Sequence, residues 1–375
     1  MCSEVAAEAF HNKQKMERVF SMNAGNGDYS YAQNSTWQKD ELLRAKSELE
    51  ECIKSWKTIL ECETLCIADL GCSCGPNALL ITEIITTLIR NKYAHNGIRV
   101  PDFHVFYNDL PSTDFNTLFR LLSAAPPVET SYFAAGVPGS FYTRLFPPKS
   151  LHFVHSSFSL HWLSQVPPQV EDKNSKLWNK GRIYISEKGP AGIEDAYFAQ
   201  FQEDFNCFLR ARAKEVVEGG RMFLVLNGRL NAGRRRPTSS ALCWEALGFA
   251  IQDLVSQGLI EEEKLNSFNM PYYDAFEDEL RSEVDKEGSF NVVGLKVNIN
   301  YDDLEEFDDK DKGIIISKQT RALLENLISY HFGEGVVDAL FNRYSKVIAA
   351  NIIQIDELLK ESTSIILALE RAIST

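Results

Sequence analysis

Hydrophobic residues along the chain follow two alternating patterns. Short runs of consecutive apolar residues predict buried strands, and these runs lie at residues 65–70, 103–107, around 154–155 and at 222–226. Longer stretches with apolar positions at helical spacing predict helices, and these lie at residues 41–60, 78–90 and 195–217, the last closed by two glycines at 219–220. Strands that alternate with helices in this way are typical of a mostly parallel sheet with helices on both faces. We therefore expect an α/β fold.

The pattern changes after residue 228, where helical periodicity dominates. Residues 242–257 and 320–346 are predicted helices, and the acidic residues 301–312 are predicted to form a loop. Apolar runs at residues 290–297 and 364–369 predict two more strands.

We expect both late strands to return to the main sheet. The predicted core is then residues 1–228 with the strands near 290–297 and 364–369. The predicted helical cap comprises residues 229–289 and 298–355, and it is inserted into the core rather than forming an independent domain.

The turn after residues 65–70 carries the most specific chemical signal. Asp69 is followed by small residues at every second position, Gly71, Ser73 and Gly75. Such a turn lets backbone approach a ligand at the carboxyl end of a strand, where open α/β sheets bind nucleotides. The spacing differs from the phosphate-binding patterns G-x-x-x-x-G-K-[ST] and G-x-G-x-x-G. An adenosine-containing cofactor without phosphates fits better, and S-adenosylmethionine is the candidate.

Composition narrows the partners of this cofactor site. The 375 residues carry a net charge of −13, which argues against a nucleic acid and favours small-molecule chemistry. We interpret the basic residues 234–237 as a solvated loop. Residues 1–15 lack the apolar segment of a signal peptide, and no run of about 18 apolar residues predicts a membrane helix. We expect a cytoplasmic protein with no membrane partner.

The eight cysteines are scattered, which favours reduced thiols in the cytosol. Four of them, Cys62, Cys66, Cys72 and Cys74, are close in sequence but contain no C-x-x-C unit. We therefore expect no zinc site there.

Six segments form an ordered series from residue 22 to residue 164. They read MNAGNG at 22–27, SYAQNS at 30–35, ADLGCSCGPN at 68–77, NDLPSTDFN at 108–116, GVPGSFY at 136–142 and HSSFSLHWLS at 155–164. Together they resemble the plant SABATH methyltransferase family. Its members methylate salicylate, benzoate, jasmonate, indole-3-acetate and related carboxylates, and include the xanthine N-methyltransferases of caffeine biosynthesis. The resemblance implies a Rossmann-like class I methyltransferase core, a mostly helical substrate cap and a homodimer.

The resemblance also implies cofactor-binding residues. Asp109 ends a predicted strand, where a carboxylate can accept hydrogen bonds from both ribose hydroxyls. Leu110 and Phe141 are expected to enclose the adenine, with Ser140 as a polar contact. The remaining implied cofactor residues are Tyr31, Ser35, Asp69, Gly71, Cys72 and Asn77.

On the acceptor side, the resemblance implies that Gln38 and Trp162 hold a carboxylate. An indole N–H only donates and an amide can present its NH₂, so together they suit an anion. Phe158 and His161 are expected to line the acceptor pocket, and Trp244 is expected to close it.

We expect no catalytic base in this site. A carboxylate is already ionised at pH 7, with an ordinary pKa near about 4. His161 is therefore interpreted as a shape and hydrogen-bonding residue. Catalysis would come from proximity and the exclusion of water, with the cofactor supplying the chemistry.

Some members of the family are described with a magnesium ion. The matching positions are Asn179, Asn266, Phe268 and Asn269. The family usually has Asp in place of Asn266, and magnesium prefers anionic oxygen ligands. We give this site little mechanistic weight.

Three alternatives to a carboxyl methyltransferase of a small plant acid stay open. N-methylation of a xanthine is the first, although Phe158 stands where xanthine-methylating relatives tend to carry Tyr. A buried xanthine would also need partners for its ring polar atoms. A nucleotide-dependent oxidoreductase is the second, and it predicts a G-x-G-x-x-G pattern that the chain lacks here. The third is a catalytically silent binding protein.

Overall fold

The computed structural model describes residues 20–57, 62–124, 132–230, 233, 238–299, 307–353, 355 and 363–373. The basic cluster at 234–237, the N-terminal residues 1–15 and residues 301–306 of the predicted acidic loop lie outside these ranges. No helix within them is long and apolar enough to span a bilayer.

The described chain contains a seven-stranded sheet in the order β3-β2-β1-β4-β5-β7-β6. Its strands are β1 (Thr64–Leu70), β2 (Asp102–Asp109), β3 (Phe133–Pro138), β4 (Leu151–Ser157), β5 (Val216–Gly228), β6 (Phe290–Ile299) and β7 (Thr363–Arg371). Strands β3, β2, β1, β4 and β5 are mutually parallel, and β7 runs antiparallel to both β5 and β6. This is the mostly parallel, Rossmann-like α/β sheet that the sequence predicts. The chain order reverses between β1 and β4, where such sheets bind ligands.

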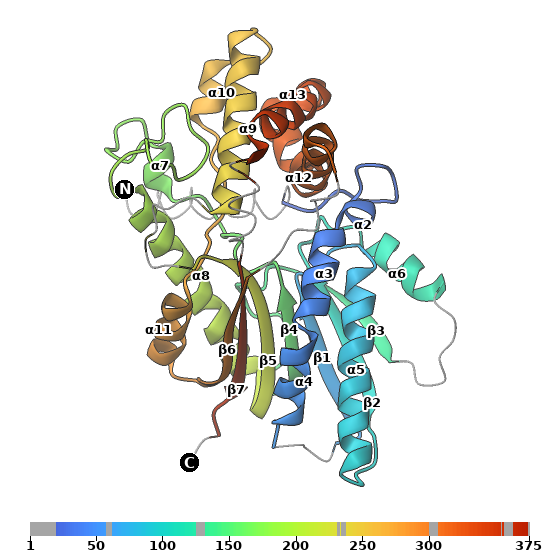
Figure 1. The fold of residues 1–375 in the computed structure, drawn as a ribbon. Coiled ribbons are helices and arrows are strands. Elements are labelled where there is room, and N and C mark those ends of the chain that lie inside the picture. The colour runs from blue at the N-terminus through green and yellow to red at the C-terminus, as the bar shows by residue number, and fades with distance from the viewer. Residues whose placement is uncertain are drawn as a thin grey trace.

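Helices form three groups around the sheet (Figure 1). One face carries α3 (Thr36–Arg44), α4 (Lys46–Lys54) and α5 (Asn77–His95), and the other carries α8 (Ile193–Glu215) and α11 (Glu277–Glu287). Beyond one end of the sheet lie α9 (Ser239–Ser256), α10 (Glu262–Asn266), α12 (Asp309–Phe332) and α13 (Val337–Ala350), which we call the helical layer. The short helices are α2 (Tyr31–Asn34), α6 (Phe115–Ala124), α7 (Pro168–Glu171) and a 3₁₀ turn at Glu334–Val336.

Consecutive apolar residues in β5 explain why both faces of the sheet are covered. Met222 and Leu224 belong to the buried cluster that includes the aromatic residues of α8. Phe223 and Val225 point to the other face and belong to the cluster formed with α3, α4 and α5. A strand that is apolar at successive positions is stable only when both of its faces are buried.

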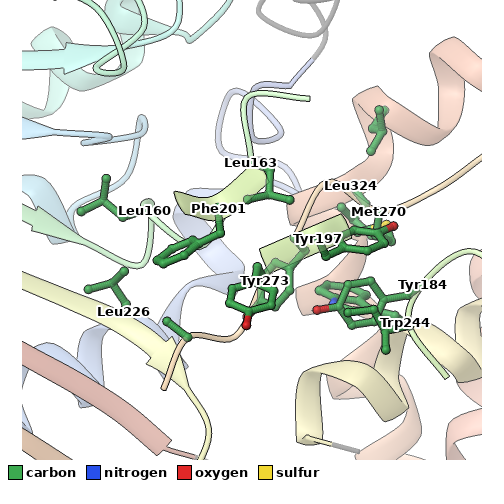
Figure 2. Packing of buried hydrophobic residues seen from close by; sticks show 14 of the residues in the cluster. Leu160, Leu163, Tyr184, Tyr197, Phe201, Leu226, Trp244, Met270, Tyr273 and Leu324 are labelled. Carbon is green, nitrogen blue, oxygen red and sulfur yellow. The ribbon is translucent and has the colours of Figure 1, made fainter. Parts of the chain in front are cut away.

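The core continues from the sheet into the helical layer. Figure 2 shows Leu160 and Leu226 beside the sheet on one side of the cluster, with Trp244 and Leu324 from the helical layer on the other. Tyr273 lies between them. The helical layer therefore packs as part of the same core and is held at a fixed position over the sheet.

Most predicted elements are present, with shifted ends. The strands expected at 290–297 and 364–369 both pair in the main sheet. The residue limits of a core and a cap stay a prediction.

Four predictions about single elements are wrong. The helix expected at 41–60 breaks at Ala45, and the helix expected at 320–346 breaks at Gly333, whose φ of 98° no helix can adopt. The glycines at 219–220 lie inside β5 rather than closing α8. The acidic stretch becomes helical from Asp309, because the side chain of Asp308 caps α12 by accepting from the N–H of Asp311.

Candidate active site

A cavity of about 240 Å³ lies where the carboxyl ends of the parallel strands meet the helical layer. The turn after β1 contributes Gly71 and Ser73, and the end of β2 contributes Asp109 and Leu110. Further walls come from the segment after β4, from the end of β5, from α9 and α12, and from the chain before α3. We call the part lined by Gly71, Ser73 and Asp109 the cofactor side, and the part lined by Gln38, His161 and Trp162 the acceptor side.

Asp109 organises the cofactor side of the cavity. Its Oδ1 accepts from the N–H of Leu110 and the hydroxyl of Thr113, and its Oδ2 accepts from the N–H of Ser73, each at 2.7 Å. Burial raises the pKa of this carboxyl, and these hydrogen bonds oppose the rise. A carboxylate offers about four acceptor positions. Three are used to fix the turn, so about one remains for a ligand hydroxyl.

Gly71 makes the turn narrow enough to approach a ligand. Its φ is 78°, and a Cβ at this position would lie 2.2 Å from Oγ of Ser159. The N–H groups of Gly71 and Cys72 both donate to the carbonyl of Asn108, which ties the turn to β2. No side chain larger than hydrogen fits here, as expected where backbone must approach a ligand.

Backbone strain is concentrated at this cavity. Within the described ranges, the non-glycine residues with positive φ are Ser73, Lys149 and Phe158. Ser73 and Phe158 both line the cavity, on its two sides. Residues in this conformation persist only where the surroundings impose it, and they cluster at functional sites.

Aromatic rings form the walls of the acceptor side. The distance between ring centroids is 4.7 Å from Trp162 to Phe20, 4.9 Å from Trp162 to Tyr272 and 6.0 Å from Trp162 to Trp244. Gln38 and Trp162 make no side-chain hydrogen bond to the described residues, and the Gln38 carbonyl oxygen is buried without a partner. Their donors remain available to a ligand.

His161 is fixed in its neutral form. Its Nδ1 accepts from the main-chain N–H of Asn227 at 3.1 Å, and burial lowers its pKa to about 3. A main-chain N–H can only donate, so the imidazole proton must be on Nε2. His161 is therefore a hydrogen-bond donor to the cavity, and it has no free lone pair with which to remove a proton.

The cavity contains no lysine or arginine in its described lining. Asp109 is its sole carboxylate, and it belongs to the cofactor side. An acid bound between Gln38 and Trp162 would thus meet neutral donors. No side chain of the described lining would offer its negative charge a positive partner.

Comparison with known proteins shows what this arrangement belongs to. A family model described as SAM dependent carboxyl methyltransferase matches residues 17–372. The chain is a member of the S-adenosylmethionine-dependent carboxyl methyltransferase family. This is the family that the ordered motifs indicate, and its cofactor, S-adenosylmethionine, contains no phosphate.

Individual members of the family are similar over nearly their whole length. S-adenosyl-L-methionine:benzoic acid/salicylic acid carboxyl methyltransferase 3 of Petunia hybrida is 41% identical over 359 residues, covering 93% of this chain and 96% of the relative. A 3,7-dimethylxanthine N-methyltransferase of Camellia sinensis var. assamica is 38% identical, covering 96% of this chain and 98% of the relative. A solved structure, loganic acid methyltransferase with SAH, is 36% identical with a TM-score of 0.87. The match covers 94% of this chain and 99% of the chain in that structure. The carboxyl methyltransferase fold expected from the sequence is thereby confirmed.

The predicted cofactor residues of this methyltransferase fall into two groups. The first lines the cavity and comprises Tyr31, Gly71, Asp109, Leu110, Ser140 and Phe141. The second lies one layer behind the lining. There the Asn77 amide donates to the carbonyl of Ser35 at 3.0 Å, Asp69 contacts Nδ1 of His155 at 2.7 Å, and the Cys72 thiol donates to the carbonyl of Ser73. The second group can position the turn but does not form the cavity wall.

All five predicted acceptor residues line the cavity, namely Gln38, Phe158, His161, Trp162 and Trp244. Trp244 comes from α9 and places the helical layer directly over the acceptor side.

The four residues matched to a magnesium site lie together elsewhere. Asn179 donates to Oδ1 of Asn269 at 2.9 Å, and Oδ1 of Asn266 accepts from the N–H of Gly181 at 2.9 Å. Phe268 is buried against Phe332. No carboxylate takes part, and the described residues contain no cluster of three or more His, Cys, Asp or Glu suited to a metal. The side-chain oxygens of Asn266 and Asn269 are already hydrogen-bonded, whereas Oδ1 of Asn179 is buried without a partner. One unpaired neutral oxygen among these residues does not form the anionic cage that magnesium prefers.

Several lining residues are missing from the sequence-based prediction. Asn227, Ser240 and Tyr272 join the cavity, as do Gln319 and Thr320 of α12. One signal was available for Asn227, because it is the polar residue that ends the apolar run at 222–226. Nothing in the local sequence of α12 indicates which of its polar residues face the sheet.

Proposed function

We propose that the chain transfers a methyl group from S-adenosylmethionine to a carboxylate oxygen of a small acid, giving a methyl ester and S-adenosylhomocysteine. One observation carries the proposal. The acceptor side of the cavity offers neutral donors from Gln38 and Trp162, and its one imidazole, that of His161, has its lone pair engaged and cannot act as a base. It therefore suits a nucleophile that arrives already ionised, as a carboxylate does.

The residues supply position and a dry environment rather than acid–base chemistry. S-adenosylmethionine, when bound, supplies an electrophilic methyl group on a positively charged sulfur. Asp109 and the turn at Gly71 hold the cofactor side, and Gln38 and Trp162 orient the acid. Fixing two reactants in register can contribute about 7–11 kcal/mol to lowering a barrier. The aromatic walls around Trp162 exclude water, which strengthens each of these hydrogen bonds.

N-methylation is the second candidate, since the relative from Camellia sinensis var. assamica is a xanthine N-methyltransferase. A xanthine N–H must lose its proton during transfer. His161 cannot take that proton, because its Nδ1 lone pair is engaged and its pKa is about 3. This favours the carboxylate.

A methyl-transfer screen tests the proposal directly. Purified protein is incubated with radiolabelled methyl donor and benzoate, salicylate, anthranilate, cinnamate, jasmonate, indole-3-acetate or xanthines. We expect labelled product from at least one acid, and base treatment should release the label as expected for an ester. Label that survives base, or that forms only with xanthines, would contradict the proposal.

A variant then locates the carboxylate. Trp162→Phe keeps an aromatic ring and removes the indole donor, so kcat/KM for the preferred acid should fall at least tenfold while S-adenosylhomocysteine affinity is retained. A charged hydrogen bond contributes about 1.5–3 kcal/mol, which corresponds to a factor of about 10 or more. Leu323→Ile in α12 is the matched control, because it changes the shape of the same wall without removing a donor.

A further inference from the structure

The acceptor side contains more unpaired hydrogen-bonding atoms than a bound carboxylate would use. Three atoms of its lining are buried without any partner among the described residues, and these are Oε1 of Gln38, Oδ1 of Asn227 and Nε1 of Trp244. An unpaired buried polar atom is destabilising, so folded proteins rarely keep several in one place. Their gathering around one cavity indicates a ligand that pairs with them.

Asn227 is the best positioned of the three. Its main-chain N–H donates to His161, and its side-chain NH₂ donates to the hydroxyl of Tyr272 at 2.8 Å. The Tyr272 hydroxyl lies 3.1 Å from Oγ of Ser240, in α9. The amide is therefore held between the sheet and the helical layer, and its carbonyl oxygen is the group left over.

Asn227 also determines what its neighbour His161 presents. Because the Asn227 N–H occupies Nδ1, the Nε2–H of His161 can only donate. A donor and an acceptor thus come from two residues joined by one hydrogen bond. A hydroxyl group matches this pair, since it donates one hydrogen bond and accepts others.

We propose that Asn227 and His161 form a second polar subsite that binds a hydroxyl group of the acceptor acid, remote from its carboxylate. This inference rests on the proposed function and names the class of acid: a hydroxy acid rather than an unsubstituted one. The hydroxyl donates to Oδ1 of Asn227 and accepts from Nε2–H of His161. Gln38 and Trp162 hold the carboxylate at the other end.

A site built to bind a hydroxyl rejects the analogue that lacks it, because its own polar groups then stay unpaired. Acids are therefore compared in pairs that differ by one hydroxyl. Benzoate is compared with its three monohydroxy isomers, cinnamate with its three ring-hydroxylated isomers, and cyclohexanecarboxylate with its hydroxy derivatives. The acid with the highest kcat/KM should carry a hydroxyl away from its carboxylate, and its partner without it should be at least tenfold poorer. A best acid whose only hydroxyl lies beside the carboxylate counts against the second subsite.

Asn227→Leu removes both polar atoms at similar size, and it should reduce this hydroxyl preference at least tenfold. Tyr272→Phe, which deletes one hydroxyl that orients the amide, should reduce it in the same direction and covers the case in which Asn227→Leu does not fold. Ile316→Val lines the same cavity without a polar atom and should affect both acids of a pair alike.

The possible failures are separable. If the best acid carries no hydroxyl, or if Asn227→Leu leaves the preference unchanged, the second subsite is refuted while ester formation stands. If no acid is methylated and a xanthine is, the proposed function falls, and the orphaned polar atoms are assigned to the xanthine ring instead.

Discussion

Replacing Gly71 with alanine tests whether the turn after β1 must be made of bare backbone. Two costs follow from the structure. The first is the φ of 78°, which costs a residue with a Cβ about 1–2 kcal/mol. The second is overlap, since the new Cβ would lie 2.2 Å from Oγ and 2.6 Å from Cβ of Ser159. Forcing extra volume into a packed site costs about 1–3 kcal/mol, so the total is about 2–5 kcal/mol.

A matched control separates the two costs. Gly97 also has positive φ, 66°, but a Cβ there meets nothing within 4 Å. Gly97→Ala should therefore lose about 1–2 kcal/mol of unfolding free energy from backbone strain alone. The excess cost of Gly71→Ala over Gly97→Ala reports the overlap at the turn.

Two measurements are needed, because the turn can respond in two ways. If it keeps its shape, urea unfolding should show the full loss of stability. If it shifts to relieve the overlap, calorimetry should show at least a tenfold loss of S-adenosylhomocysteine affinity. Ser159→Gly removes both overlapping atoms, so the double variant with Gly71→Ala should recover at least about 1 kcal/mol in a double-mutant cycle. The reasoning is refuted if Gly71→Ala matches Gly97→Ala in stability and binds S-adenosylhomocysteine as the wild type does.

Three further predictions concern titration and charge. Burial raises the pKa of Asp274 from 3.8 to about 6, so its stabilising contribution is complete below pH 3.8 and lost as pH rises through 6. Asp274→Asn should therefore gain up to about 3 kcal/mol over wild type between pH 4 and 7 in urea unfolding. The pKa of His161 is lowered to about 3, so wild type loses stability as pH falls below 6.5. His161→Gln should lose less on acidification, by up to about 5 kcal/mol, and should keep methyl transfer with a shifted acid preference; abolished transfer with intact cofactor binding would contradict this role. Finally, the preferred acid should bind at least tenfold more tightly with a cationic cofactor analogue such as sinefungin than with neutral S-adenosylhomocysteine, and equal affinities would contradict the charge argument.

The sheet was predictable from sequence because its strands are buried on both faces. A strand such as residues 222–226 is apolar at every position, and few other structures bury such a run. The edge strand β3 was missed because Phe133–Pro138 is short, only partly buried and rich in small residues. It therefore lacks the continuous apolar run that marks a buried strand. The helix breaks at Ala45 and Gly333 were also missed, because the helical spacing of apolar residues continues on both sides of each break.

All five predicted acceptor residues line the cavity, but lining residues that the sequence left out, such as Asn227 and Thr320, belong to this same side. Gly71 directly follows β1 and Asp109 is the last residue of β2, so their positions depend on local sequence and on the meeting of parallel strand ends. The acceptor side joins residues from the end of β5, from α9 and from α12. Which side chains of these distant elements converge depends on how the helical layer packs on the sheet, and local sequence does not encode that packing.

The absence of a lysine or arginine from the described lining has a consequence for turnover. A lysine beside Trp162 would hold the acid strongly before transfer, yet it would remain as an unpaired buried charge once the ester is formed. Opposite charges about 4 Å apart attract by about 4 kcal/mol at a protein surface. With neutral donors from Gln38 and Trp162, this attraction can exist only between the acid and a positively charged cofactor, and methyl transfer neutralises both. Under the proposed function, the same uncharged wall binds the acid in the presence of the cofactor and releases the ester after transfer.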